Sequence, residues 1–351
     1  MIEIAVVVVL ILSLMMILLS CEIFTNGIEW TGLRLGLAET ATGSILAAVG
    51  TAMPETIVPL IAIFLGSTGG GEEIGEGAIL GAPFMLGTLA MFIGGVTVWW
   101  RFKKHKMPSS LVVRRDHAER DMKYFMVMYS LALMAGLIGL WATFDTKYLN
   151  YAIAVILMGT YFVYLRRTLR DEREETDHTC PALYMSRLTK LECESGRLGM
   201  VMIFFQVIAA LIGIIIGAKF FVDSVETVST ELGVAPMILA FLLVPIATEL
   251  PEKFNSVIWY LRGKDTLGFG NITGAMVFQS SFPVSVGLLF TAWSLEAVNI
   301  ASIIIAMLAS AWMFISIRQK NGISYKVMLA SGSLYIVYII LLIFVGVGDS
   351  V

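Results

Sequence analysis

The sequence predicts an all-α integral membrane protein with ten transmembrane helices in two inverted five-helix repeats, each repeat having a helix broken near the membrane midplane. Of its 351 residues, 58% are hydrophobic and only 15% are charged. A soluble domain of this length could not bury so much apolar surface, so the bilayer must act as its solvent. A helix needs roughly 20 apolar residues to cross a bilayer. Apolar runs of about this length or longer cover residues 2–20, 36–66, 75–100, 122–142, 148–166, 199–222, 234–261, 268–292, 296–317 and 325–347.

The internal repeat is visible in residues 47–55 and 244–252, which read AAVGTAMPE and VPIATELPE. Shifting the first stretch by 197 positions places Thr51 on Thr248, Pro54 on Pro251 and Glu55 on Glu252. Each stretch puts a carboxylate directly after a proline inside an apolar run. An ionisable group within the membrane is costly and indicates function. Matched interruptions in two halves are typical of a transporter's binding site.

The distribution of basic residues predicts the orientation, because cytoplasmic loops are enriched in Lys and Arg. Residues 101–123 carry eight basic side chains and residues 166–197 carry seven. With ten spans, these segments and the basic turns near residues 262–264 and 318–326 fall on one side. The sequence therefore predicts a multi-pass protein of the cell membrane with its amino terminus outside.

The predicted organisation is a first five-helix repeat at residues 1–166, a cytoplasmic connector at 167–198 and a second five-helix repeat at 199–351. Because five is an odd number, the second repeat enters the membrane in the opposite sense. The two halves are therefore expected to form an inverted repeat with a site near the midplane.

Three local features have alternative interpretations. The run Leu18–Cys21 resembles a lipoprotein cleavage box, but no basic residue precedes the apolar run, so a retained first helix is expected. His178, Cys180 and Cys193 in the connector form only an irregular metal-ligand pattern. The basic segments are interpreted mainly as determinants of topology, with contact to anionic lipid headgroups as the alternative.

The prolines determine which backbone groups the predicted site can offer. Proline has no amide hydrogen, so Pro54 frees the carbonyl of Gly50 and Pro251 frees that of Ala247. Pro245 is expected to open a second break in the same helix. In each stretch the Thr and the Glu are four residues apart and share one helix face.

Two carboxylates, two hydroxyls and several unpaired carbonyls would converge if the two broken helices cross at the midplane. Ca²⁺ binds about 6–8 oxygens and often takes bidentate carboxylates. This donor set predicts a divalent-cation site. The alternative is that Glu55 and Glu252 have only structural roles, in salt bridges inside the bundle.

At these residues the chain resembles the calcium/cation antiporter superfamily, which includes the sodium/calcium exchangers. The family's repeats carry a G-T-S-x-P-E signature, which here reads GTAMPE at residues 50–55 and ATELPE at 247–252. A second signature, G-N-x-x-G-S-N-x-x-N, reads GAILGAPFML at residues 77–86 and GNITGAMVFQ at 270–279. The resemblance covers both membrane halves and is more specific in the second.

The resemblance implies that Glu55 and Glu252 are the central divalent-ion ligands, with Thr51 and Thr248 beside them and the carbonyls of Gly50 and Ala247 nearby. The serines of the family signatures are replaced by Ala52, Ala82, Glu249 and Ala275. The last signature position, Asn or Asp in the family, holds Leu86 in the first half and Gln279 in the second. Loss of the four hydroxyls argues against sodium coupling of the family's usual kind.

Glu249 introduces a charge where the family signature has a serine, and Lys253 is a second charge placed deep in a predicted span. Lys253 lies four residues after Glu249, so the two could pair on one helical face and make Lys253 a charge-compensating residue. The alternative is that Lys253 extends to the cytoplasmic interface. A third carboxylate could also carry a proton.

The predicted function is secondary-active antiport, exporting Ca²⁺ or another divalent cation in exchange for H⁺ or Na⁺ by alternating access. The cation-binding residues are expected to be Glu55, Glu252, Thr51, Thr248, Glu249, Gly50, Ala247 and Gln279. The expected partners are the bilayer and inorganic cations, with no cofactor and no nucleic acid. The alternatives are monovalent cation/proton exchange, an intramembrane enzyme that uses the paired glutamates, and a passive channel.

Overall fold

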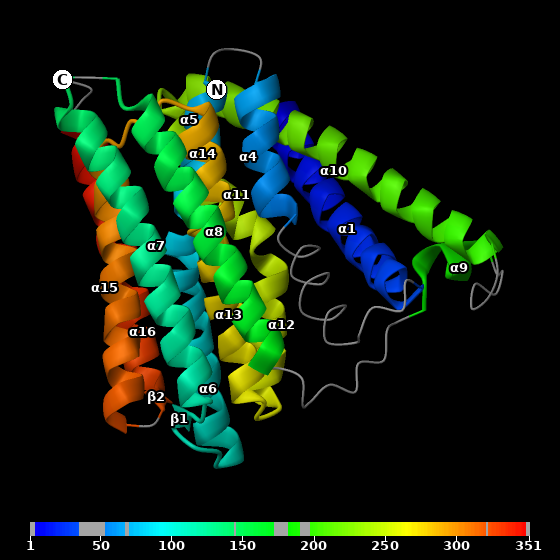
Figure 1. The fold of residues 1–351 in the computed structure, drawn as a ribbon, viewed down its shortest axis with the longest axis vertical. Helices are drawn as coiled ribbons and strands as arrows, with labels where there is room; N and C mark the ends of the chain where they lie inside the picture. The colour runs from blue at the N-terminus through cyan, green and yellow to red at the C-terminus, as the bar shows by residue number, and fades with distance from the viewer. Residues whose placement is uncertain are drawn as a thin grey trace.

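The computed structural model describes residues 4–34, 53–66, 70–143, 145–171, 182–189, 197–320 and 322–348. These residues form an all-helical bundle with one two-stranded antiparallel sheet (Figure 1). The elements are α1 (Ile4–Arg34), α4 (Met53–Leu65), α5 (Gly71–Met85), a π-helical turn η2 (Leu86–Ala90), α6 (Met91–His105), β1 (Ser110–Leu111), α7 (Arg115–Trp141), α8 (Lys147–Asp171), α9 (Tyr184–Thr189), α10 (Arg197–Leu232), α11 (Pro236–Thr248), α12 (Leu250–Leu261), α13 (Asp265–Gln279), α14 (Phe282–Phe290), α15 (Ala297–Lys320), β2 (Ile323–Ser324) and α16 (Tyr325–Gly348).

Eight of the described helical stretches are long and apolar enough to cross a membrane, and two shorter apolar helices cover Glu55–Leu65 and Pro236–Pro245. The predicted span at 36–66 falls partly outside the described residues, and its described part is α4. The predicted span at 234–261 is divided into α11 and α12. The multi-pass, all-helical prediction is confirmed, and the described part of the chain holds eight helices of spanning length where ten were predicted.

The helix interruptions differ from the predicted ones. Pro245 lies inside α11 without breaking it, so the predicted second break is wrong. The irregular residue is Glu249, between α11 and α12. A Cβ built on Gly81 of α5 would lie 2.9 Å from Pro245 Cγ, so the missing side chain leaves room for the proline ring. That room lets the helix continue past Pro245.

Two further interruptions were not predicted. The run from α5 to α6 passes through η2, where the hydrogen bonds change to the π pattern. The predicted span at 268–292 is divided between α13 and α14 at Ser280 and Ser281, whose hydroxyls donate to the carbonyl of Val277. Serine hydroxyls compete in this way for helix carbonyls and favour a bend.

The long helices α1 and α10 form an antiparallel pair that leans away from the other helices (Figure 1). Small residues bring the two helices together, because a Cβ on Gly213 would lie 2.4 Å from Ser20 Oγ and one on Gly217 would lie 3.0 Å from Ile17 Cγ1. The opposite face of the pair exposes large apolar side chains such as Phe204 and Phe205. Such an apolar surface suits contact with lipid.

The directions of the central helices follow from their closest contacts. Helix α4 runs antiparallel to α5, since Gly71 packs on Gly66 and the carbonyl of Ala62, whereas Gly75, one turn later, packs on the carbonyl of Pro59. Helix α5 runs parallel to α11, since Gly77 packs on Met237 and Gly81 on Phe241. Helices α4 and α11 therefore point in opposite directions.

The described basic residues at the end of α6, the start of α7 and the end of α15 meet at one end of the bundle. Arg101 at the end of α6 pairs with Asp265 at the start of α13 and also donates to the carbonyl of Tyr260. Glu119 of α7 lies 3.9 Å from Arg318 of α15. Strands β1 and β2 pair at the same end, which is the lower end of the bundle in Figure 1.

Candidate cation-binding site

The junction between α11 and α12 is a local departure from helical geometry at one residue. Glu249 has φ −84° and ψ 2°, yet its N–H still donates to the carbonyl of Pro245 at 3.2 Å. The N–H of Lys253 donates in turn to the carbonyl of Glu249 at 3.2 Å. Pro251 has no N–H, so it cannot donate to the carbonyl of Ala247. The junction therefore keeps backbone hydrogen bonds on both sides of Glu249, and the carbonyl of Ala247 lacks the donor four residues later that a regular helix would supply.

The carboxylate of Glu249 is fully buried and meets the end of a second interrupted helix. Gln279, the last residue of α13, donates from Nε2 to Glu249 Oε1. Its own Oε1 is buried and has no hydrogen-bond donor among the described residues. The family-signature positions 249 and 279 are thus in direct contact, and an amide oxygen remains available next to the carboxylate.

Lys253 points back along its helix toward the junction. Its ammonium donates to the carbonyl of Pro245 at 3.2 Å and lies 3.1 Å from Met85 Sδ, and the residue is only 6% exposed. This placement differs from extension to the interface. Pro245 therefore accepts both the backbone N–H of Glu249 and the ammonium of Lys253. The contact brings the amino group of Lys253 to the interrupted segment.

Met85 was missed by the sequence analysis. It is the last residue of α5 and is fully buried immediately before η2. Its one sequence signal is its place next to Leu86, the last position of the second signature. The interruptions after Met85, at Glu249 and after Gln279 are connected by the side-chain contacts of Lys253 and Gln279.

Thr248 and Glu55 are buried at 2% and 3% exposure. The hydroxyl of Thr248 donates to the carbonyl of Val244 at 3.1 Å, so its lone pairs remain available to a cation. Glu55 lies in the first turn of α4, which packs against α5, α10, α11 and α14.

Four predicted site residues are incompletely covered. Gly50 and Thr51 lie outside the described residues. Ala247 and Glu252 have described backbones in α11 and α12, but their side chains are not described. Within the described part of the chain, no group of three or more His, Cys, Asp or Glu residues is placed to hold a metal ion. The described donors are carboxylate, amide, hydroxyl and carbonyl oxygens, the types that hard cations prefer.

Known membrane proteins are similar to this chain in sequence and in fold. The chain is 22% identical over 303 residues to an uncharacterised membrane protein of Methanocaldococcus jannaschii, covering 85% of this chain and 86% of that protein. Its fold is similar to the crystal structure of the H⁺/Ca²⁺ exchanger CAX, with a TM-score of 0.74, 16% identity, and coverage of 95% of this chain and 82% of the other.

A second solved structure, the sodium-calcium exchanger NCX_Mj, gives a TM-score of 0.55 at 20% identity and covers 96% of this chain and 98% of the other. The model of the family described as sodium/calcium exchanger protein matches residues 5–169 and 202–344. This family is one of membrane exchangers, so the chain is a cation antiporter and not an enzyme. It belongs to the sodium/calcium exchanger protein family.

Proposed function

We propose that the protein exports Ca²⁺ or another divalent cation in exchange for H⁺ or Na⁺, with H⁺ the favoured counter-ion. The observation that carries this proposal is the buried contact between Glu249 and Gln279, which joins two interrupted helices. A buried carboxylate at a helix interruption needs a cation or a proton to balance its charge. The H⁺/Ca²⁺ exchange named for one structural neighbour supports the same pairing of ions.

The divalent ion is bound by Glu55 and Glu252 as central ligands in this proposal. Thr51 and Thr248 contribute hydroxyls, and Gly50 and Ala247 contribute carbonyls that proline frees. The burial of Glu55 and Thr248 supports these assignments, because a buried oxygen donor has no competing water.

The proposed architecture is two inverted five-helix repeats joined by the connector 167–198. The opposite directions of α4 and α11 support it, because α4 begins within the first copy of the first signature and α11 ends within the second copy. Alternating access follows from this arrangement, because the two halves can exchange roles on either side of the site. The amino terminus lies outside and the connector lies in the cytoplasm of a cell-membrane protein.

Gln279 gives Glu249 a partner in both protonation states. When Glu249 is ionised, the amide donates from Nε2 to the carboxylate, as in the structure. When Glu249 is protonated, rotation of the amide lets Oε1 accept the carboxylic O–H, because an amide is both donor and acceptor. The carboxyl can therefore take up and release a proton while it stays buried.

Lys253 supplies a tethered positive charge in the same segment. Its ammonium is held on the carbonyl of Pro245, next to the backbone of Glu249. Where the family uses serine hydroxyls, this chain has Ala52, Ala82, Glu249 and Ala275. A fixed ammonium and a titrating carboxyl together replace bound Na⁺ in this proposal.

The experiment is counter-ion-resolved efflux from proteoliposomes, with ⁴⁵Ca²⁺ inside and either a pH or a Na⁺ gradient imposed. Efflux that follows the pH gradient is expected, and Glu55→Gln and Glu252→Gln should each abolish it. Glu73→Gln, at an exposed carboxylate of α5, is the matched control and should transport normally. Wild-type rates in either site variant contradict the assignment. Na⁺ flux without any divalent transport would identify a monovalent cation/proton exchanger instead.

A further inference from the structure

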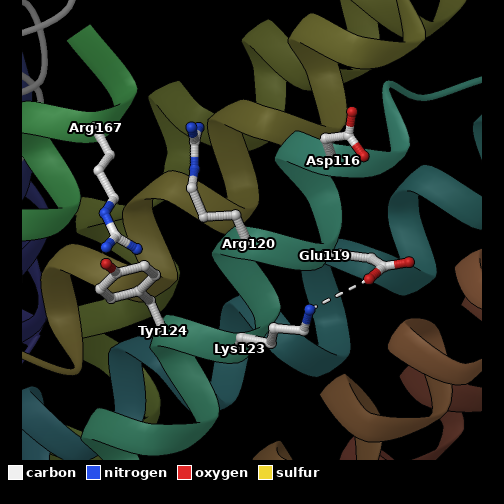
Figure 2. Close-up of a pocket in the computed structure, with 6 residues that line it drawn as sticks. All are labelled: Asp116, Glu119, Arg120, Lys123, Tyr124 and Arg167. Carbon is white, nitrogen blue, oxygen red and sulfur yellow. Dashed lines mark hydrogen bonds and ion pairs between the residues drawn. The ribbon is translucent and has the colours of Figure 1, made fainter. Parts of the chain in front are cut away.

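A pocket of about 290 Å³ lies between α7 and α8 and is independent of the proposed transport site. It is lined by Asp116, Glu119, Arg120, Lys123, Tyr124 and Arg167 (Figure 2). Figure 2 shows Arg167 extending from α8 toward Tyr124 of α7, with Arg120 beside them. Three cationic groups and a phenol therefore approach one small space from two helices.

The pocket has two groups that are ready to bind an anion. Among the described residues, neither the guanidinium of the exposed Arg167 nor the hydroxyl of the half-buried Tyr124 has a hydrogen-bond or ion-pair partner. Both are donors that can bond to phosphate oxygens, and a guanidinium can donate two hydrogen bonds to one phosphate.

The acidic residues of the pocket are already compensated. Glu119 lies 2.7 Å from Arg115, 3.3 Å from Lys123 and 3.9 Å from Arg318. Asp116 is in the first turn of α7, where a negative charge complements the helix dipole. The surroundings of the pocket therefore remain positive.

The depth of the pocket matches that of phospholipid headgroups. From Lys147 to Arg167, α8 rises about 30 Å at about 1.5 Å per residue, which equals the roughly 30 Å thickness of the hydrocarbon core. The opposite ends of α7 and α8 carry Trp141 and Tyr148, which are 85% and 80% exposed. Exposed aromatic residues mark a membrane–water interface. Arg167 then lies at the other interface, at phosphate level.

We propose that this pocket binds the phosphate of an anionic phospholipid, with Arg167, Lys123 and Tyr124 as donors. The site is connected to the bundle interior through Arg120, which lies 3.6 Å from Asp121. Asp121 accepts hydrogen bonds from Tyr164 of α8 at 3.1 Å and from Thr273 of α13 at 2.7 Å. A bound headgroup therefore fixes α7 and α8 against the helix that ends in Gln279.

The test uses the purified full-length protein in detergent and measures lipid binding by native mass spectrometry. Phosphatidylglycerol and phosphatidylcholine with identical acyl chains are the probes. Phosphatidylglycerol should bind about tenfold more tightly, and Arg167→Gln should weaken that binding about fivefold, as expected for loss of one basic residue at an anionic surface. Combining Arg167→Gln with Tyr124→Phe should weaken it further.

The matched control is Lys147→Gln, which removes a cation from the opposite end of α8 and should leave phosphatidylglycerol binding unchanged. Millimolar inorganic phosphate should not displace the lipid. Complete displacement by phosphate would assign the pocket to a soluble anion and overturn the lipid as its source. Equal binding of the two lipids, unaffected by Arg167→Gln, would overturn the site itself.

Discussion

The side-chain amide of Gln279 donates a hydrogen bond to the fully buried carboxylate of Glu249, joining the end of α13 to the junction of α11 and α12. The two residues occupy positions at which the family signatures carry other side chains. This contact is the most specific departure of the chain from the signatures, and it leads to the first prediction.

Gln279→Met should leave the carboxylate of Glu249 without its amide donor. Loss of a hydrogen bond to a buried charged group costs about 1–3 kcal/mol, so the variant should unfold at a lower temperature and transport more slowly. Because the amide no longer serves both protonation states, the pH dependence of transport should also change shape. Thermal unfolding and efflux at several pH values measure these effects. Gln319→Met, at an exposed glutamine of α15, is the control and should behave like the unmodified protein.

Lys253→Ala should raise the apparent affinity for divalent cations by about tenfold, which corresponds to about 1.4 kcal/mol, because it removes a positive charge from the cation site.

Glu249→Ala should reduce the dependence of transport on pH. Both are measured as efflux rates over a grid of Ca²⁺ concentration and pH, with Lys264→Ala, at an exposed lysine between α12 and α13, as the control. A steep, cooperative Na⁺ dependence at fixed pH in the unmodified protein would show that these residues do not replace bound sodium.

Gly81→Ala should force α5 and α11 apart. A Cβ at this position would lie 2.3 Å from the carbonyl oxygen of Phe241, a backbone atom that cannot move aside. We expect a loss of about 1–3 kcal/mol, the usual cost of overpacking. Gly159→Ala is the control, since nothing lies within 4 Å of a Cβ there. Thermal unfolding should separate the two variants clearly, and equal melting temperatures would show that the helices are not closely packed at Gly81.

Cys180 and Cys193 should resist labelling by a membrane-impermeant thiol reagent in intact cells, because the basic residues predict a cytoplasmic connector. Permeabilised cells should label readily. Glu73→Cys, at the start of α5, is expected to react from outside and serves as the positive control. Efficient labelling of Cys180 in intact cells would reverse the proposed orientation.

The positions of the membrane helices could be predicted from the sequence, because apolar runs bounded by charged segments carry that information. The described helices α8, α15 and α16 begin within a residue of their expected starts. Helix α7 begins earlier than expected, because it extends into the basic segment. The common end of the basic segments was also predictable. Both predictions depend on composition along the chain and not on contacts.

The detailed shape of the helices was less predictable. Pro245 was expected to break its helix, but the small Gly81 on α5 accommodates its ring. The interruptions at η2 and at Ser280–Ser281 depend on which carbonyl each backbone N–H or serine hydroxyl bonds to. The hydrophobicity of the sequence carries no information about these hydrogen bonds. The contact between Lys253 and Met85 joins residues that are far apart in the chain, so only the packed structure identifies Met85.

The hydrogen bonds that continue through Glu249 also constrain how the site can open. Because Glu249 and Lys253 keep their backbone acceptors, we expect α11 and α12 to move together as one bent rod. A loop at this point would let each half swing alone, whereas a bonded bend transmits displacement from one end to the other. Access to the site would therefore change by tilting the whole rod against its neighbours, and release of the Lys253 ammonium from Pro245 is the step that would soften the bend.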